Sequence, residues 1–163
     1  MPFFLLAVGA IVIVAAMYDA MTLTIPNWIS LALIGLFPVV AFLAGFDLST
    51  VGIHVAVGSA ALITGMVLFA FHFIGGGDAK FFAAVSFYVG LSAAGSYLMT
   101  VVIAGGVLAI VLMMARRLAQ MGFAMDWFLR FTRGGSVIPY GIAIAFGALT
   151  VLPQTQIFAS AMA

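Results

Sequence analysis

The sequence predicts an all-α, polytopic integral membrane protein with about six transmembrane helices. Hydrophobic residues make up 67% of the 163 residues and charged residues only 6%, whereas a soluble domain carries about 25% charged residues. Apolar stretches near the roughly 20 residues that a spanning helix needs recur along the chain. The composition therefore excludes an ordinary soluble domain, and it excludes a disordered chain, which requires low hydrophobicity and high charge.

The charge balance and the absence of cysteine narrow the functional classes. The formal net charge is +1, with five Lys and Arg against four Asp and no Glu, so no basic face for nucleic acid is expected. The chain contains no cysteine, which removes disulfides, thiolate metal sites and thiol nucleophiles.

Six apolar segments follow one another, separated by polar breaks. The expected spans are residues 3–18, 28–46, 51–74, 81–94, 96–115 and 137–153. The first segment lacks the positively charged start and the cleavage site of a signal peptide, so it is taken as a span. Residues 90–95 are compatible with a tight turn or with a kink inside one long hydrophobic stretch. No polar stretch is long enough for a soluble domain, and residues 1–163 are expected to form a single membrane-embedded domain.

The basic residues predict the orientation. Four of the five lie between the fifth and sixth spans: Arg116, Arg117, Arg130 and Arg133. Short loops rich in Lys and Arg face the cytoplasm, so the loop at 116–136 is expected there. Alternation then places the loops at 19–27 and 75–80 on the same side, and both termini on the outer, periplasmic side. All five basic residues thereby fall on the cytoplasmic side, which supports the count of six spans.

This topology brings Asp19 and Asp78 to the same edge of the membrane. An ionisable residue at that depth is costly and indicates a function, and the natural partner of each carboxylate is the other. Two carboxylates that lie close together share one proton near neutral pH. The ionised member can take a proton from water while the protonated member polarises a carbonyl, which is aspartic protease chemistry and needs no metal or other cofactor. Alternatively, each aspartate only caps a helix end.

The remaining ionisable residues offer no competing catalytic set. His54 is expected near the outer end of the third span, far from both aspartates. His72 lies near the inner end, where it either approaches the site or is a buried or snorkelling side chain. Asp47 and Asp126 are interpreted as ordinary turn and loop residues.

Three short motifs are expected around the aspartates. Gly75-Gly76-Gly77 directly precedes Asp78, and glycine permits positive φ and close backbone approach, so a substrate strand can lie against it; a plain inter-helix turn is the alternative. Lys80 adds a cation that either acts on Asp78 or binds lipid phosphate. Pro26-Asn27 and Pro139-Tyr140-Gly141 open the second and sixth spans, because proline suits the first turn of a helix.

These residues together resemble the type IV prepilin peptidases, a family of polytopic aspartic proteases. The family carries an aspartate followed by [IL]-P-[ND], a G-x-G-D-x-K motif and a P-[FY]-G motif in a late helix. Asp19 with Ile25-Pro26-Asn27, Gly75-Gly76-Gly77-Asp78-Ala79-Lys80 and Pro139-Tyr140-Gly141 match these in order. The resemblance implies that Asp19 and Asp78 are catalytic and that the substrates are prepilins and pseudopilins. It also implies a multi-pass protein of the bacterial cytoplasmic (inner) membrane, with its active site facing the cytoplasm.

One departure from the longer family members is informative. They carry an additional cytoplasmic, cysteine-bearing region linked to metal binding and N-methylation, which this chain lacks. The resemblance is therefore to the short, protease-only branch found with Flp (Tad) pilus systems, and no N-methyltransferase activity is expected. Residues 122–131, with Trp127 and Arg130, are expected to lie along the lipid headgroups, near Arg117 and Arg133, as an anchoring or substrate-docking segment.

The sequence is also compatible with other functions. The presenilin and signal peptide peptidase group also uses Tyr-Asp and G-x-G-D, but its chains are longer and carry a P-A-L motif. A small transporter or assembly subunit would use the aspartates for proton or cation coupling, although transporter sites usually lie near the midplane of the bilayer. A purely structural membrane subunit would leave the aspartates and the triple glycine unexplained.

Overall fold

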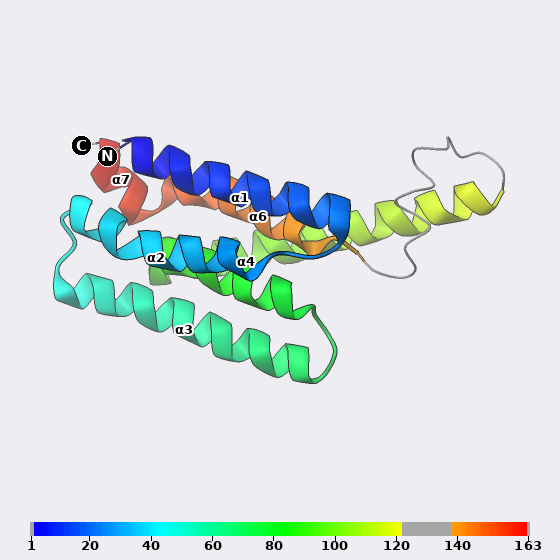
Figure 1. Ribbon diagram of the computed structural model, residues 1–163, viewed down its shortest axis with the longest axis horizontal. Coiled ribbons are helices and arrows are strands. Elements are labelled where there is room, and N and C mark those ends of the chain that lie inside the picture. Colours follow the sequence, from blue (N-terminus) through cyan, green and yellow to red (C-terminus); the bar gives the residue numbers. More distant parts are fainter. Residues whose placement is uncertain (1, 122–137, 163) are drawn as a thin grey trace.

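The computed structural model describes residues 2–121 and 138–162, and all regular structure within them is helical (Figure 1). The elements in chain order are α1 (Pro2–Thr22), α2 (Asn27–Leu43), α3 (Leu48–Ala70), α4 (Gly76–Gln120), α6 (Tyr140–Val151), the 3₁₀ helix η1 (Leu152–Gln154) and α7 (Gln156–Met162). By length and composition, α1, α3 and α4 can each cross a membrane, and α2 and α6 are shorter apolar helices. The chain is thus an all-helical membrane protein, as predicted.

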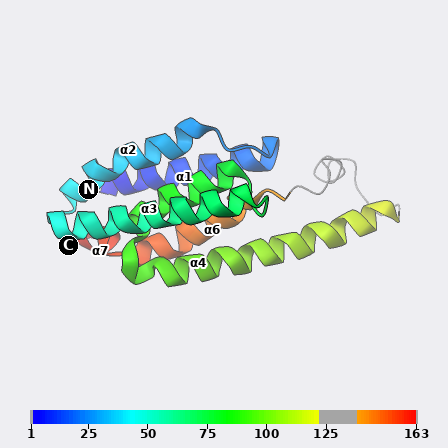
Figure 2. The ribbon, with the colours of Figure 1, turned by 90° about the horizontal axis from the view of Figure 1, so that it is seen from below.

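Helix α4 is a hairpin of two limbs rather than one rod. Gly90 has φ 67° and ψ −179°, and the chain reverses there (Figures 1 and 2). The ring centroids of Phe82 and Tyr97 lie 4.9 Å apart, whereas fifteen residues of straight helix would separate them by about 22 Å. The structure therefore shows a tight turn at Gly90 and not a kink within one long helix. The first limb (76–89) and the second limb (91–120) correspond to the fourth and fifth expected spans.

Several helix ends differ from those expected from hydropathy. Helix α1 runs to Thr22, so Asp19 lies in a helix and not in a loop. Helix α4 begins at Gly76 and ends at Gln120, so Lys80, Arg116 and Arg117 are also helical. Pro26 and Pro139 stand one residue before α2 and α6, not in their first turns. Hydropathy misplaces these ends because a helix stops where its backbone geometry changes, not where its side chains become polar.

A buried histidine supports the turn at Gly90. The side chain of His54 in α3 is 3% exposed, and its Nδ1 lies 2.7 Å from the carbonyl oxygen of Phe87. Because a carbonyl only accepts, Nδ1 carries the proton and donates it. The end of the first limb leaves carbonyl groups without helical partners, and His54 satisfies one of them. A Cβ atom at position 90 would lie 2.6 Å from His54 Cε1.

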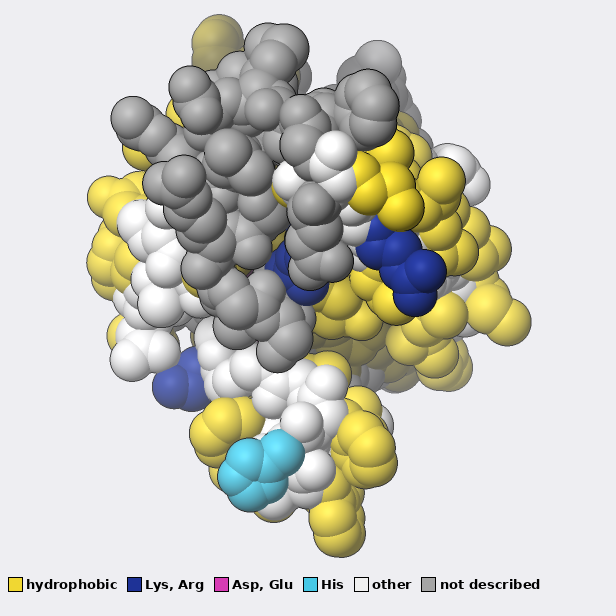
Figure 3. All heavy atoms as spheres, turned by 90° about the vertical axis from the view of Figure 1, so that its right-hand side faces the viewer, with side chains coloured by type: hydrophobic (Ala, Val, Ile, Leu, Met, Phe, Trp, Pro, Cys, Tyr) yellow, Lys and Arg dark blue, Asp and Glu magenta, His cyan; other side chains and the backbone are white. Residues whose placement is uncertain are grey.

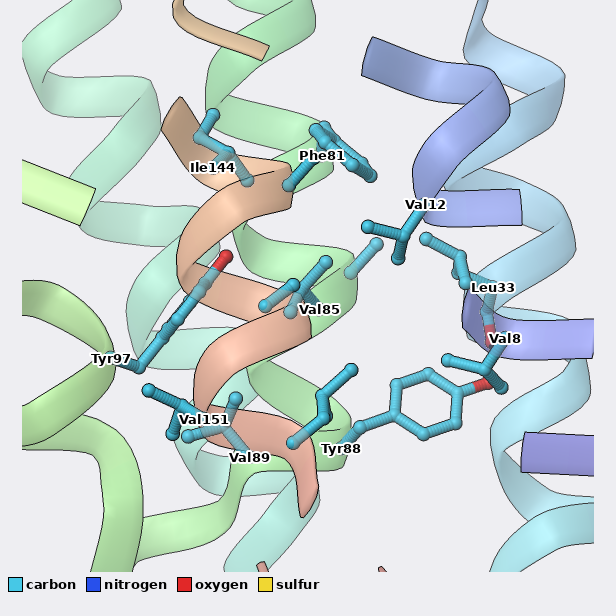
Figure 4. Packing of buried hydrophobic residues seen from close by; sticks show 14 of the residues in the cluster. Val8, Val12, Leu33, Phe81, Val85, Tyr88, Val89, Tyr97, Ile144 and Val151 are labelled. Atoms are coloured by element: carbon cyan, nitrogen blue, oxygen red, sulfur yellow. Dashed lines mark hydrogen bonds between the residues drawn. The ribbon is translucent and has the colours of Figure 1, made fainter. Parts of the chain in front are cut away.

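The first limb is the central helix of the bundle. Its inward residues Phe81, Val85, Tyr88 and Val89 are buried against α1, α2 and α6 (Figure 4). The hydroxyl of Tyr88 donates to the carbonyl oxygen of Leu33 at 2.5 Å, which ties the limb to α2. Packing on several sides fixes the position of this limb, and therefore of the residues at its beginning.

Replacing Gly90 by alanine tests the turn. The positive φ alone costs about 1–3 kcal/mol for a residue with a side chain, and the new Cβ also overlaps His54. Gly45 has a similar φ of +71° with nothing within 4 Å of an added Cβ, so Gly45→Ala is the control. Thermal unfolding in detergent should show a markedly larger loss of stability for Gly90→Ala. Equal losses would mean that His54 does not confine the turn.

Candidate active site

A cavity of about 650 Å³ opens at the end of the bundle where α4 begins. Its walls come from the α1–α2 connection, the α3–α4 connection and the start of α6. The lining residues are Asp19, Leu23, Thr24, Ile25, Asn27, Phe69, His72, Phe73, Ile74, Gly75, Gly76, Gly77, Asp78, Ile138 and Tyr140. The structure thus brings Asp19 and Asp78 to one cavity, although 58 residues separate them in the sequence.

Asp19 is recessed and held by the backbone of α6. Its side chain is 4% exposed, and the backbone N–H of Gly141 donates to Asp19 Oδ2 at 2.6 Å. Gly141 lies in the first turn of α6, where free N–H groups favour an anion. A Cβ atom at position 141 would lie 2.7 Å from Asp19 Oδ2. The Pro139-Tyr140-Gly141 motif therefore supplies a donor and the space for a close approach.

Asp78 is the third residue of α4 and interacts with the N-terminus of its own helix. The Asp78 carboxylate folds back onto the N-cap residue of its own helix, where the backbone of Gly75 donates to it and a Cβ atom added at Gly75 would lie 2.8 Å from Oδ2. A carboxylate in the first turn that binds the N-cap N–H is the acidic half of a capping box. Asp78 thus caps a helix and also faces the cavity, so the two sequence interpretations are compatible.

The three glycines before Asp78 are needed for close packing rather than for unusual dihedral angles. Among the described glycines, only Gly45 and Gly90 have positive φ, so of the two properties that glycine permits, positions 75–77 use close approach and not positive φ. An added Cβ would lie 2.8 Å from Asp78 Oδ2 at Gly75, 3.3 Å from the Phe69 ring at Gly76 and 3.4 Å from Ile25 at Gly77. The chain's own atoms occupy this space, beside the cavity that all three glycines line.

Lys80 joins two of the motifs directly. Its Nζ donates to Asn27 Oδ1 at 3.0 Å, so the first turns of α4 are tied to the start of α2. Sequence reasoning had weighed an action on Asp78 against lipid binding, and neither included this bond. The aspartate-bearing limb and the Ile25-Pro26-Asn27 segment are thereby held in one register at the rim of the cavity.

Tyr140 and His72 complete the walls. Tyr140 lines the cavity, and its ring covers Gly105, where an added Cβ would meet Cε1 at 2.9 Å. His72, in the α3–α4 connection, also lines the cavity and has a φ of 61°, which is unusual for a residue with a side chain. Figure 3 shows a histidine and several basic side chains on this end of the molecule, and no acidic side chain is visible among the coloured residues.

Two supporting glycines were missed from the sequence. Gly65 in α3 lets Ala79, the neighbour of Asp78, approach so closely that an added Cβ would lie 2.9 Å from the Ala79 Cβ. Gly105 does the same for Tyr140. Glycines inside apolar helices are a recognisable signal of close helix contact, but the sequence does not indicate the partner.

Other residues singled out from the sequence lie elsewhere. Asp47 is the N-cap of α3 and accepts from the Thr50 backbone N–H at 3.0 Å; hydrogen bonds from the Thr50 side chain and backbone hold the pKa of Asp47 below its usual value. Asp126, Trp127, Arg130, Arg133 and the segment 122–131 lie outside the described residues. Within 2–121 and 138–162, no group of three His, Asp or Glu side chains is placed to hold a metal.

A comparison with models of known protein families identifies the family of this chain. The model of the type IV leader peptidase family matches residues 6–114, which is more than half of the sequence and includes both cavity aspartates. The chain belongs to this family. The resemblance found from the motifs is thereby confirmed, and the protein is a membrane-embedded peptidase in general character. Pro139-Tyr140-Gly141 lies beyond the matched stretch. No curated protein and no solved structure matches the chain.

The Lys80–Asn27 bond predicts the outcome of a double-mutant cycle. Lys80→Met and Asn27→Ala should each lower kcat/KM for leader cleavage about tenfold, and the double variant should be no worse than either, because both remove one interaction. Lys80→Gln should keep part of the activity, since its amide can still donate. If Lys80→Gln is as impaired as Lys80→Met, the charge of Lys80 matters rather than the bond.

Gly141→Ala should displace Asp19. The added Cβ overlaps the carboxylate and the Ile25 side chain, and a misplacement of about 1 Å in an active site can cost about 100-fold in rate. We expect a loss of that size in kcat, while thermal unfolding shows a protein that is still folded. Gly106→Ala, which meets nothing within 4 Å, is the control. Wild-type kcat in Gly141→Ala would contradict the role given to this contact.

Proposed function

We propose that this protein is an aspartic endopeptidase that removes the short, positively charged leader from prepilins and pseudopilins at the cytoplasmic face of the bacterial inner membrane. The observation that carries the proposal is the shared cavity of Asp19 and Asp78 in a chain of the type IV leader peptidase family. Family membership favours this activity over proton- or cation-coupled transport and over the presenilin-like proteases.

The two carboxylates divide the chemistry between them. They share one proton, because two charges in one recessed cavity repel. The ionised carboxylate takes a proton from water as the water oxygen attacks the carbonyl carbon of the scissile bond, and the protonated carboxyl donates to the carbonyl oxygen. The tetrahedral diol then collapses. The C–N bond breaks, the leaving amine takes the proton that came from water, and a hydroxyl returns a proton to the second carboxylate.

The distribution of charge supports a cytoplasmic site. Lys80 lies in the first turns of α4, and Arg116 and Arg117 lie near the C-terminus of this helix. Because α4 is a hairpin, all three residues lie toward the end of the bundle that contains the cavity. Asp47 and both termini lie at the opposite end (Figure 1). Lys and Arg mark the cytoplasmic side of membrane proteins, so the cavity is assigned to that side.

The length of the first limb supports a recessed site. Residues 76–89 are about 21 Å long as a helix, whereas the hydrocarbon core is about 30 Å thick. With the Gly90 turn at the outer boundary, the aspartates lie roughly 10 Å inside the cytoplasmic boundary. Substrate must therefore be drawn a short way into the membrane, and its peptide bond must be unwound there, since helical carbonyls are already hydrogen-bonded.

The resemblance to the short, protease-only members of the family limits the proposed activity to peptide-bond cleavage. The chain has no cysteine and resembles the short, protease-only members, so the proposal includes leader cleavage without N-methylation. Membrane lipid is a second partner, bound through the apolar outer faces of the helices. No cofactor forms part of the proposed reaction.

A processing assay in a heterologous host tests the proposal. A Flp-type prepilin is expressed with the enzyme, and loss of the leader is followed by its mobility shift. Asp19→Asn and Asp78→Asn should each abolish cleavage, since each removes one of the two proton-transfer groups. Asp47→Asn, which alters only the cap of α3, should cleave as wild type. Cleavage that persists in both Asp19→Asn and Asp78→Asn would overturn the assignment of the pair.

A further inference from the structure

A second hollow lies on the lateral face of the bundle, between the second limb of α4 and α6. This groove has a volume of about 500 Å³. It is lined mainly by Ile103, Ala104 and Val107 from α4 and by Ile142, Ala143 and Phe146 from α6. Its polar contribution is Thr100, whose hydroxyl donates to the Ser96 carbonyl of its own helix at 2.7 Å. The groove therefore offers shape and apolar surface rather than hydrogen bonds.

The groove adjoins the catalytic cavity at Tyr140. One side of Tyr140 lines the cavity, and its ring packs on Gly105, which follows Ala104 of the groove. Ala143, one turn after Tyr140 in α6, lines the groove and also lies beside Gly105. Tyr140 thus lies between the cavity and the groove, at the height where Asp19 meets α6.

The groove runs along the second limb from Thr100 to Val111, and so extends to both sides of Gly105. Thr100 lies about 7 Å deeper than Gly105 along the second limb, which is more than one helical turn. Ile103 and Phe146 belong to the same deeper half. A helix lying in this half would have its end beside Tyr140, next to the aspartates.

We infer that the groove binds the first turns of the hydrophobic helix of the precursor, and so presents the preceding peptide bond to the cavity. The inference rests on the proposed function, since it names the surface that holds the substrate of that reaction. Within lipid, helices associate through close packing, for which small residues such as Ala104 and Ala143 leave room. The position of the groove next to the aspartate cavity, across Tyr140, favours the substrate over other occupants, because only a substrate must reach both hollows together.

Photo-crosslinking tests the occupant directly. Ile103 and Ile63 are both 64% exposed, and each lies two residues from a glycine at the depth of the site, Gly105 or Gly65. Ile103→p-benzoylphenylalanine and, as the matched control, Ile63→p-benzoylphenylalanine are each placed in the full-length enzyme with Asp78→Asn, and a full-length prepilin is co-expressed. Because this enzyme is inactive by design, the readout is binding and does not depend on cleavage.

An adduct of enzyme and prepilin from position 103 and not from position 63 is the expected result. An adduct of two enzyme chains from position 103 would show that a second copy occupies the groove. Formation of lipid adducts alone would show that it is an ordinary lipid-facing surface. Adducts with prepilin from both positions would show unselective lateral contact. Each of these three results would overturn the inference while leaving the proposed reaction intact.

Filling the groove gives an independent readout. Ala104→Leu should raise KM for full-length prepilin about tenfold with little change in kcat, whereas Ala60→Leu, at an exposed position on α3, should not. A soluble peptide that carries the leader and ends shortly after the cleavage site should be cut equally by both. If Ala104→Leu has the wild-type KM while Asp78→Asn still abolishes cleavage, the groove does not bind the substrate helix, and the proposed peptidase function stands.

Discussion

A chain reversal at Gly90 makes the fourteen-residue first limb of α4 the centre of the bundle. The limb is buried on several sides, so it has little freedom to shift along its axis or to rotate. Its beginning carries Asp78, and its end is held by His54 and by the conformation that only glycine adopts easily. The limb is about 21 Å long as a helix, and this length fixes the distance of Asp78 from the turn.

Both carboxylates lie at helix N-termini, which belong to different parts of the chain. Asp78 faces the backbone at the N-terminus of its own helix, and Asp19 accepts from the N-terminus of α6. Helix N-termini are suited to this task, since their first N–H groups have no helical partner and the helix dipole favours negative charge. Glycine at positions 75 and 141 is the condition for both contacts, because a side chain there would occupy the space of the carboxylate.

The structure contains two neighbouring hollows of different character. The aspartate cavity is partly polar and open, so water can reach the two carboxylates. The lateral groove is apolar and suited to a helix in lipid. Tyr140 stands between them, and its position depends on Gly105 in the second limb. The hairpin of α4 therefore contributes Asp78 through one limb and one wall of the groove through the other.

The sequence by itself determined the helical membrane class, the family and the candidate aspartates. A bilayer imposes long apolar helices on any spanning chain, and the motifs are local strings that can be read without a structure. Only the tertiary structure decided that Gly90 turns the chain, that Lys80 bonds Asn27, and that the Gly141 backbone holds Asp19 from 122 residues away. These features depend on which helices pack together and at which height. Apolar helices that are hydrophobic on every face carry no pattern that names their neighbours, so packing alone resolves them.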